Sequence, residues 1–133
     1  ITGSVGDVSV SVKNTVTYNV TVASGTNEYG TGNKYYITSL SSSPSPTLRL
    51  TEGQVWVFDQ SDSTNGGHPF RFSTTPNGTH AGGSEYTTGV TTGGIPGQSG
   101  AFTRIEVAAG APTLYYYCSV HSGMGGTAYT PNA

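Results

Sequence analysis

The segment TLRLTEGQVWVFD, residues 47–59, reads as a β-strand, a tight turn and a second β-strand. Leu48 and Leu50 alternate with polar residues and so share one face of the first strand. Gly53 supplies the turn, because glycine adopts the backbone conformations that tight turns need. In the second strand two valines face one way, while Trp56 and Phe58 face the other. The segment therefore predicts two strands that each carry an apolar face, as expected of an all-β fold.

The same two-residue alternation continues along most of the chain. Valines alternate with polar residues over residues 7–23, which predicts a hairpin or one bent strand with Lys13 and Asn14 as the connection. Further strands are predicted at residues 34–38, 68–73, 101–108 and 113–118. Residues 24–33 and 74–100 are rich in Gly, Thr and Asn and are predicted loops, the second long enough to suggest a function. Many short strands and no helical pattern predict a single domain over residues 1–133, a Greek-key β-sandwich.

The amino-acid composition of the chain limits the classes of molecule that we expect it to bind. Of the 133 residues only 9% are charged, and the net charge is −2. Five scattered Lys and Arg residues make no basic patch, so we expect no nucleic-acid partner. No apolar run reaches the roughly 20 residues of a membrane span, and we expect no membrane insertion. Abundant Gly, Thr and Tyr favour an extracellular, cell-surface or virion protein, with the periplasm as the alternative.

Metal-binding residue types gather near the end of the chain, in LYYYCSVHSGMGG, residues 114–126. A lone strand cysteine such as Cys118 is most often a small buried apolar residue. His121 and Met124 follow it at three-residue steps, however, in a glycine-rich turn that can bring the three side chains together. His68 begins a strand after another turn and supplies a fourth donor. Thiolate, two imidazoles and a thioether form the donor set of a type 1 copper site.

Two other interpretations of these residues remain open. Structural zinc prefers four Cys or His ligands, so it would need His80 or a carboxylate in place of the thioether. His80 lies in a polar segment, and we expect it to be a solvated loop residue. The third interpretation is that Cys118 is a packing residue and that no metal binds.

The ligand spacing resembles the C-terminal copper loop of the cupredoxins, the blue-copper proteins. Cys-x-x-His-x-x-Met is the short loop of amicyanin-like members, and residues 47–59 resemble the central hairpin that precedes the first ligand in this family. The resemblance covers about residues 47–130 and implies a cupredoxin-like sandwich with His68, Cys118, His121 and Met124 as copper ligands. One departure is Pro69, where electron carriers of the family commonly have an asparagine that ties the two ligand loops together.

The sequence also resembles cupredoxin-like modules in large surface and virion structural proteins of marine bacteria and their phages. That resemblance, together with the low charge, implies a structural or display module whose partners are other subunits of an assembly. The alternative is a mobile electron carrier that docks a redox partner. We expect no enzymatic activity, because four protein ligands leave no position on the metal for a substrate.

Overall fold

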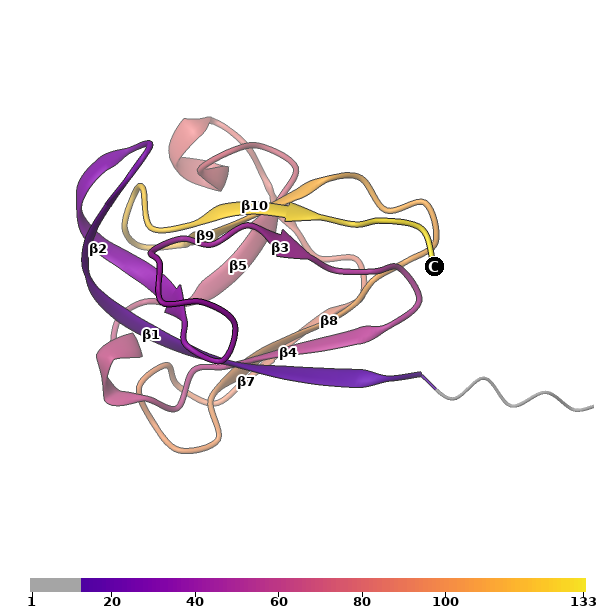
Figure 1. The fold of residues 1–133 in the computed structure, drawn as a ribbon, viewed down its shortest axis with the longest axis horizontal. Coiled ribbons are helices and arrows are strands. Elements are labelled where there is room, and N and C mark those ends of the chain that lie inside the picture. The colour runs from indigo at the N-terminus through magenta and orange to yellow at the C-terminus, as the bar shows by residue number, and fades with distance from the viewer. Residues whose placement is uncertain (1–12) are drawn as a thin grey trace, which may run out of the picture.

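The computed structural model describes residues 13–133 and shows two five-stranded β-sheets packed face to face (Figure 1). The first sheet has the order β2 (Gly30–Ile37), β1 (Thr15–Asn27), β4 (Val55–Asp59), β8 (Phe102–Glu106) and β7 (Val90–Gly93). The second has the order β3 (Leu48–Arg49), β10 (Gly126–Tyr129), β9 (Leu114–Cys118), β5 (Phe70–Ser73) and β6 (Glu85–Tyr86). The chain passes repeatedly from one sheet to the other, which confirms the predicted Greek-key β-sandwich.

Strand β1 ends at Asn27, beyond the predicted end of the alternation at residue 23. It pairs in parallel with β4 over residues 15–19 and then antiparallel with β2 over residues 20–27. Residues 7–12 of the predicted hairpin lie outside the described residues. The predicted loop at residues 24–33 is wrong, because it forms the outer half of the β1–β2 hairpin. The Oδ1 of Asn27 closes the turn by accepting a hydrogen bond from the Tyr29 amide. The hydroxyls of Thr26 and Thr31 form a hydrogen bond of 2.8 Å across the two strands.

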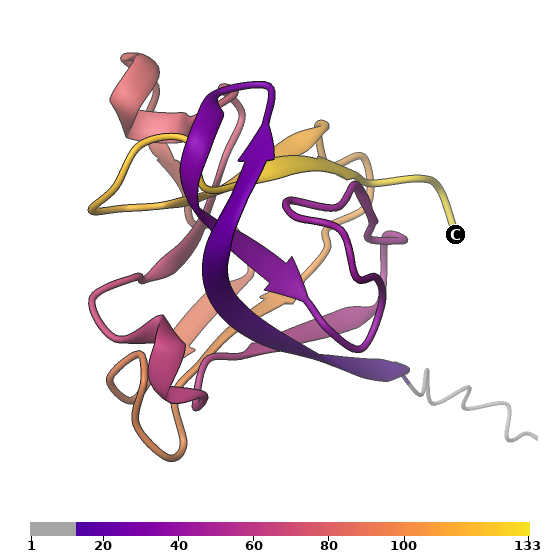
Figure 2. The same ribbon diagram turned by 60° about the vertical axis from the view of Figure 1, so that its left-hand side comes forward.

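The two strands of residues 47–59 do not form a hairpin. Gly53 makes the predicted turn with a left-handed φ of +81°. Strand β3 nevertheless pairs with β10, whereas β4 pairs with β1 and β8 in the opposite sheet. The connection therefore crosses the sandwich (Figure 2). This crossing lets Leu48 from one sheet and Trp56 and Phe58 from the other fill the same core.

Residues 74–100 are more ordered than predicted. They contain a short 3-10 helix, η2 (Gly78–Ala81), and the edge strands β6 and β7. Strand β6 pairs with β5, and β7 pairs with β8, so this segment completes both sheets. A second 3-10 helix, η1 (Ser63–Asn65), precedes β5. Single helical turns of this kind leave no periodic pattern in a sequence, which is why neither was predicted.

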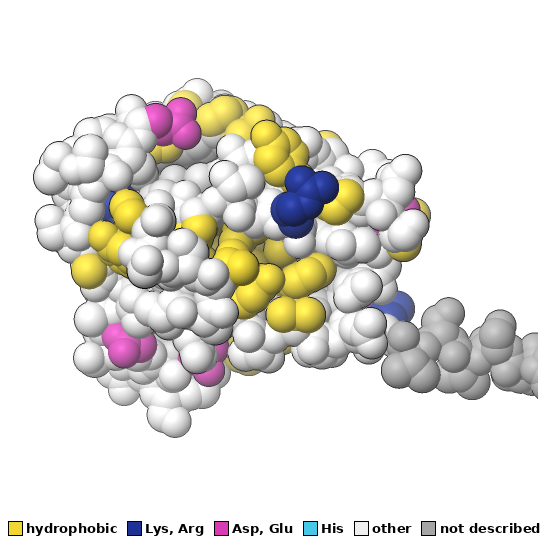
Figure 3. All heavy atoms as spheres, viewed as in Figure 1, with side chains coloured by type: hydrophobic (Ala, Val, Ile, Leu, Met, Phe, Trp, Pro, Cys, Tyr) yellow, Lys and Arg dark blue, Asp and Glu magenta, His cyan; other side chains and the backbone are white. Residues whose placement is uncertain are grey.

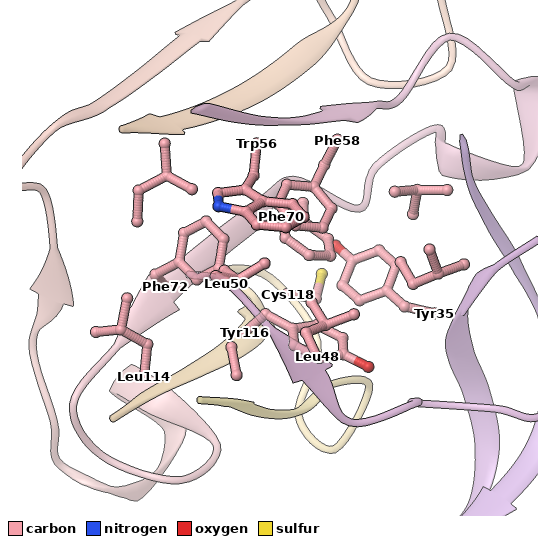
Figure 4. Packing of buried hydrophobic residues seen from close by; sticks show 14 of the residues in the cluster. Tyr35, Leu48, Leu50, Trp56, Phe58, Phe70, Phe72, Leu114, Tyr116 and Cys118 are labelled. Carbon is pink, nitrogen blue, oxygen red and sulfur yellow. The ribbon is translucent and has the colours of Figure 1, made fainter. Parts of the chain in front are cut away.

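Aromatic residues dominate the core between the sheets (Figure 4). Phe70 lies at their centre, with its ring stacked on Phe58 at 4.6 Å and on Tyr116 at 5.1 Å between centroids. Leu114, Tyr116 and Cys118 all belong to this core, so the predicted buried face of β9 is confirmed. The Cys118 sulfur lies at the edge of the aromatic group, near Phe70 (Figure 4). The thiol of Cys118 is therefore shielded from solvent.

The outer surface carries few charges, as the composition predicted. One face is mostly neutral and polar, with hydrophobic side chains between the polar groups (Figure 3). In the part of the chain that the structure describes, no helix is long and apolar enough to cross a membrane.

Candidate metal centre

Strand pairing brings the predicted ligands together. Strands β5 and β9 are antiparallel neighbours, and their register places the residues just before β5 beside the end of β9. His68 lies two residues before the start of β5, and Cys118 is the last residue of β9. His121 and Met124 follow in the connection to β10. We define the ligand loop as residues 118–124.

Two imidazoles face one thiol in this cluster. The Nδ1 atoms of His68 and His121 each lie 3.7 Å from the Sγ of Cys118. The donor atoms of these three residues all lie within 4.8 Å of one another, and the two imidazole centroids are 4.6 Å apart. Metal–nitrogen and metal–sulfur bonds of about 2.0 and 2.3 Å place such donors roughly 3.6–3.8 Å apart at ordinary coordination angles. The donor spacing therefore fits a single metal ion.

Met124 completes the cluster from the apolar side. Its side chain is 1% exposed and belongs to the same buried core as Cys118, which is fully buried. His68 is also buried, whereas His121 is exposed. All four predicted residues thus cluster at one point, with the two sulfur atoms inside and one imidazole at the surface. Soft sulfur donors in a dry pocket with imidazoles suit copper.

The electrostatic environment keeps His68 neutral. Burial, and secondly the neighbouring His121, lower the pKa of His68 below its ordinary value of 6.5. A neutral imidazole is the form that binds a metal, because its lone pair must be free. The site therefore favours the ligand form of His68 at neutral pH.

The side chain of Gln60 organises the peptide groups around Pro69. Its Oε1 accepts the Phe70 amide at 3.0 Å, and its Nε2 donates to the His68 carbonyl at 2.7 Å. The Tyr35 hydroxyl donates to the same carbonyl at 2.7 Å. Both side chains are buried, and burial raises the pKa of Tyr35 well above its usual range, so the phenol keeps its proton. These bonds hold the backbone of His68, the first predicted ligand.

Pro69 still joins the two ligand segments through its carbonyl oxygen. That oxygen accepts the Ser119 amide at 3.2 Å, which ties the start of the ligand loop to the first ligand. The His121 amide donates to the Cys118 Sγ at 3.4 Å, so the sulfur receives its hydrogen bond from within the loop. Hydrogen bonds of this kind orient the ligands and tune a metal site. The structure therefore shows which contacts hold the backbone around Pro69 in this chain.

The far end of the ligand loop is held by the β1–β2 hairpin. Tyr35 donates its amide to the Met124 carbonyl at 3.0 Å. The Lys34 Nζ and the Asn27 Nδ2 both donate to the Gly123 carbonyl, at 2.7 and 2.9 Å. Sequence patterns did not indicate these residues, because their partners lie about 90 positions away. Only the packing of the β1–β2 hairpin against the loop reveals them.

His80 is not part of the donor cluster. Its Nε2 lies 2.7 Å from the backbone oxygen of Cys118. A carbonyl oxygen only accepts, so Nε2 donates in this contact. His80 is exposed, as predicted, and its ring also bonds to the ligand strand, which the sequence did not indicate.

Fold and site together define a class: a β-sandwich of two sheets with a His/Cys/His/Met cluster, buried except for His121, that is consistent with a cupredoxin-like type 1 copper site. Comparisons of the chain with protein-family models, with curated proteins and with solved structures found no match.

Proposed function

We propose that this protein binds copper as a type 1 centre through His68, Cys118, His121 and Met124 and carries single electrons. The observation behind the proposal is the convergence of two imidazole nitrogens, each 3.7 Å from one buried thiol. The buried thioether of Met124 in the same core adds the weak fourth donor of such sites. A bound copper ion would supply one-electron redox chemistry.

Zinc fits this donor set less well. Over residues 13–133, the metal-ligand group of His, Cys, Asp and Glu side chains contains only His68, Cys118 and His121. A carboxylate or His80, either of which a tetrahedral zinc site would recruit, does not join it. The fourth donor is a thioether, which suits copper better than zinc.

The site is buried on the side of its two sulfur donors and exposed to solvent on one side only. Cys118 and Met124 are closed off from water, while His121 is exposed. Electrons would therefore pass through His121, where a partner can approach. Val120 beside it is 59% exposed and adds an apolar contact point. Four protein donors leave no place for a substrate, so catalysis is not part of the proposal.

Copper titration tests the proposal. Adding Cu(II) to the metal-free protein should produce an intense blue thiolate-to-copper absorption band that saturates at one copper per chain. Cys118→Ser should abolish the band, whereas Met124→Leu should keep it with an altered reduction potential, because the thiolate remains. The matched control Ser119→Ala changes an exposed neighbour and should keep the band. A protein that stays colourless with Cu(II) would contradict the proposal.

A structural or display role in an extracellular or virion assembly remains the second candidate, favoured by the low content of charged residues. Its partners would be other subunits, in place of a redox protein. Residues 74–100, predicted as a long loop with a function, instead form edge strands and contact the ligand loop. Size measurement of the native assembly distinguishes the candidates: many identical copies support the module, and a monomer with fast electron exchange supports the carrier.

A further inference from the structure

The segment from Thr74 to Gly83, here named the η2 arm, lies against the ligand loop. Within it Asn77 makes two side-chain hydrogen bonds to that loop. Its Nδ2 donates to the Ser122 hydroxyl at 2.8 Å, and its Oδ1 accepts the Gly123 amide at 2.8 Å. Both contacts fall between the two last predicted ligands, and they span about 45 positions of sequence.

A second residue of the same arm, His80, contacts the other end of the ligand loop. His80 donates from Nε2 to the Cys118 carbonyl at 2.7 Å. Between the two contacts, Gly78 packs on the Tyr117 ring so closely that an added Cβ would lie 2.6 Å from it. The arm thus rests on β9 and reaches both ends of the loop.

The backbone of Asn77 is held in a costly conformation. Its φ is +63°, in the left-handed region that non-glycine residues seldom occupy. Asparagine tolerates this region better than most residues do, and its short side chain is free to bond nearby groups. Here both ends of that side chain bond the ligand loop. The strained turn therefore aims the amide at Ser122 and Gly123.

We propose that Asn77 and His80 are positioning residues, forming a clamp that holds the ligand loop ready for metal and slows metal release. This inference rests on the proposed copper function for its second half. The clamp acts from outside the donor cluster, on backbone groups next to Cys118 and Met124. Polar partners of that kind typically change metal affinity 10–100-fold when they are removed.

Amide hydrogen exchange of the metal-free protein tests the first half. Asn77→Gly removes the side chain without straining the turn, because glycine accepts a positive φ. The Gly123 amide should then exchange at least tenfold faster. Asn77→Asp should restore protection, because one carboxylate oxygen can accept the Gly123 amide and the other the Ser122 hydroxyl. Asn132→Gly, at an exposed asparagine near the C-terminus, is the matched control. Unchanged exchange at Gly123 in Asn77→Gly would overturn the clamp.

Copper release tests the second half. After loading with Cu(II), each variant is mixed with excess chelator and the decay of the blue band is followed. Asn77→Gly and His80→Leu should lose copper about tenfold faster or more, as expected for lost supporting contacts. His80→Gln should be close to the parent, because its amide nitrogen can donate to the same carbonyl. Equal release rates in all variants would overturn the inference while leaving the copper function intact. A parent protein that binds no copper would overturn the proposed function and this second half, and the exchange result alone would then decide whether the clamp orders the loop.

Discussion

The side-chain Nε2 of Gln60 donates a hydrogen bond to the carbonyl oxygen of His68 at 2.7 Å, directly behind the first predicted ligand. The same side chain accepts the Phe70 amide at 3.0 Å. One buried amide thus holds the peptide groups on both sides of Pro69, which has no amide proton of its own. The first ligand is therefore positioned by a residue eight places upstream.

Replacing Gln60 with leucine should weaken both fold and site. Gln60→Leu leaves the buried Phe70 amide without its acceptor, which costs about 1–3 kcal/mol in the free energy of unfolding. Copper affinity should fall roughly 10–100-fold as the His68 peptide loses its support. Urea unfolding and competitive copper titration measure the two effects. Gln98→Leu, at an exposed glutamine, is the control, and equal results for both variants would contradict this role of Gln60.

Lys34 places a positive charge beside the ligand loop. Its side chain is 3% exposed and donates to the Gly123 carbonyl at 2.7 Å, and no carboxylate of the described residues pairs with it. A buried positive charge disfavours the more positive oxidation state of a nearby metal. Lys34→Gln keeps a donor and removes the charge, so the reduction potential should fall.

The expected size of the Lys34 effect is about tenfold in the ratio of reduced to oxidised metal, or roughly 59 mV for one electron. Redox titration of the blue band measures it. Lys13→Gln is the control, because Lys13 is half-exposed and its charge is already paired with Glu106 at 2.6 Å. A potential that does not differ between Lys34→Gln and the parent protein would show that the charge has no influence on the site.

Stability of the metal-free protein should depend on pH through His68. Its pKa is lowered in the folded state, chiefly by burial, from an ordinary value of 6.5. As the pH falls through 6.5, the unfolded chain takes up a proton that the folded chain does not yet bind. The free energy of unfolding therefore decreases until the lower folded-state pKa is passed, and it is fully recovered above 6.5.

Urea unfolding between about pH 5 and pH 8 measures this dependence. His68→Gln removes the titrating group, so its stability should change less with pH over the same range. If the parent and His68→Gln show the same pH profile, proton uptake at His68 does not govern acid sensitivity.

Gly125 allows β9 and the ligand loop to approach closely. A Cβ added there would overlap the Tyr116 carbonyl oxygen, a backbone atom that cannot turn aside. Gly125→Ala should therefore shift the loop and destabilise the protein by roughly 1–3 kcal/mol or more. Gly32→Ala is the control, since a Cβ at Gly32 meets nothing within 4 Å. Urea midpoints compare the two variants, and equal midpoints would mean that the loop accommodates the methyl group.

Local alternation was enough to predict the sandwich and the buried face of β9. Leu114, Tyr116 and Cys118 alternate with outward residues, and the core contains all three. The clustering of His68 with Cys118 was also accessible, because ligand types at short spacing after two strands indicate one site. The buried face of β9 depends on residues that are close in the sequence. The metal cluster depends on side chains, Cys, His and Met, that occur at few other positions in the chain.

The pairing partners of the strands and the contacts that support the site could not be predicted from the sequence in the same way. The strands around Gly53 looked like a hairpin, yet they join opposite sheets, because their apolar faces fill one core from two sides. The contacts of Asn77 with the ligand loop arise in a polar segment without periodicity. The contacts of such residues form only when distant strands pair. The composition of the segment therefore predicted a loop and did not indicate these contacts.

Electron paramagnetic resonance of the protein loaded with one equivalent of Cu(II) distinguishes a type 1 centre from copper held by surface groups. A type 1 centre should give the small copper hyperfine splitting of a thiolate-bound trigonal site, and Cys118→Ser should lose that signal. A spectrum with the large splitting of ordinary tetragonal Cu(II), unchanged in Cys118→Ser, would show copper held only by surface groups. That result would contradict the assignment of His68, Cys118, His121 and Met124 as a type 1 copper site.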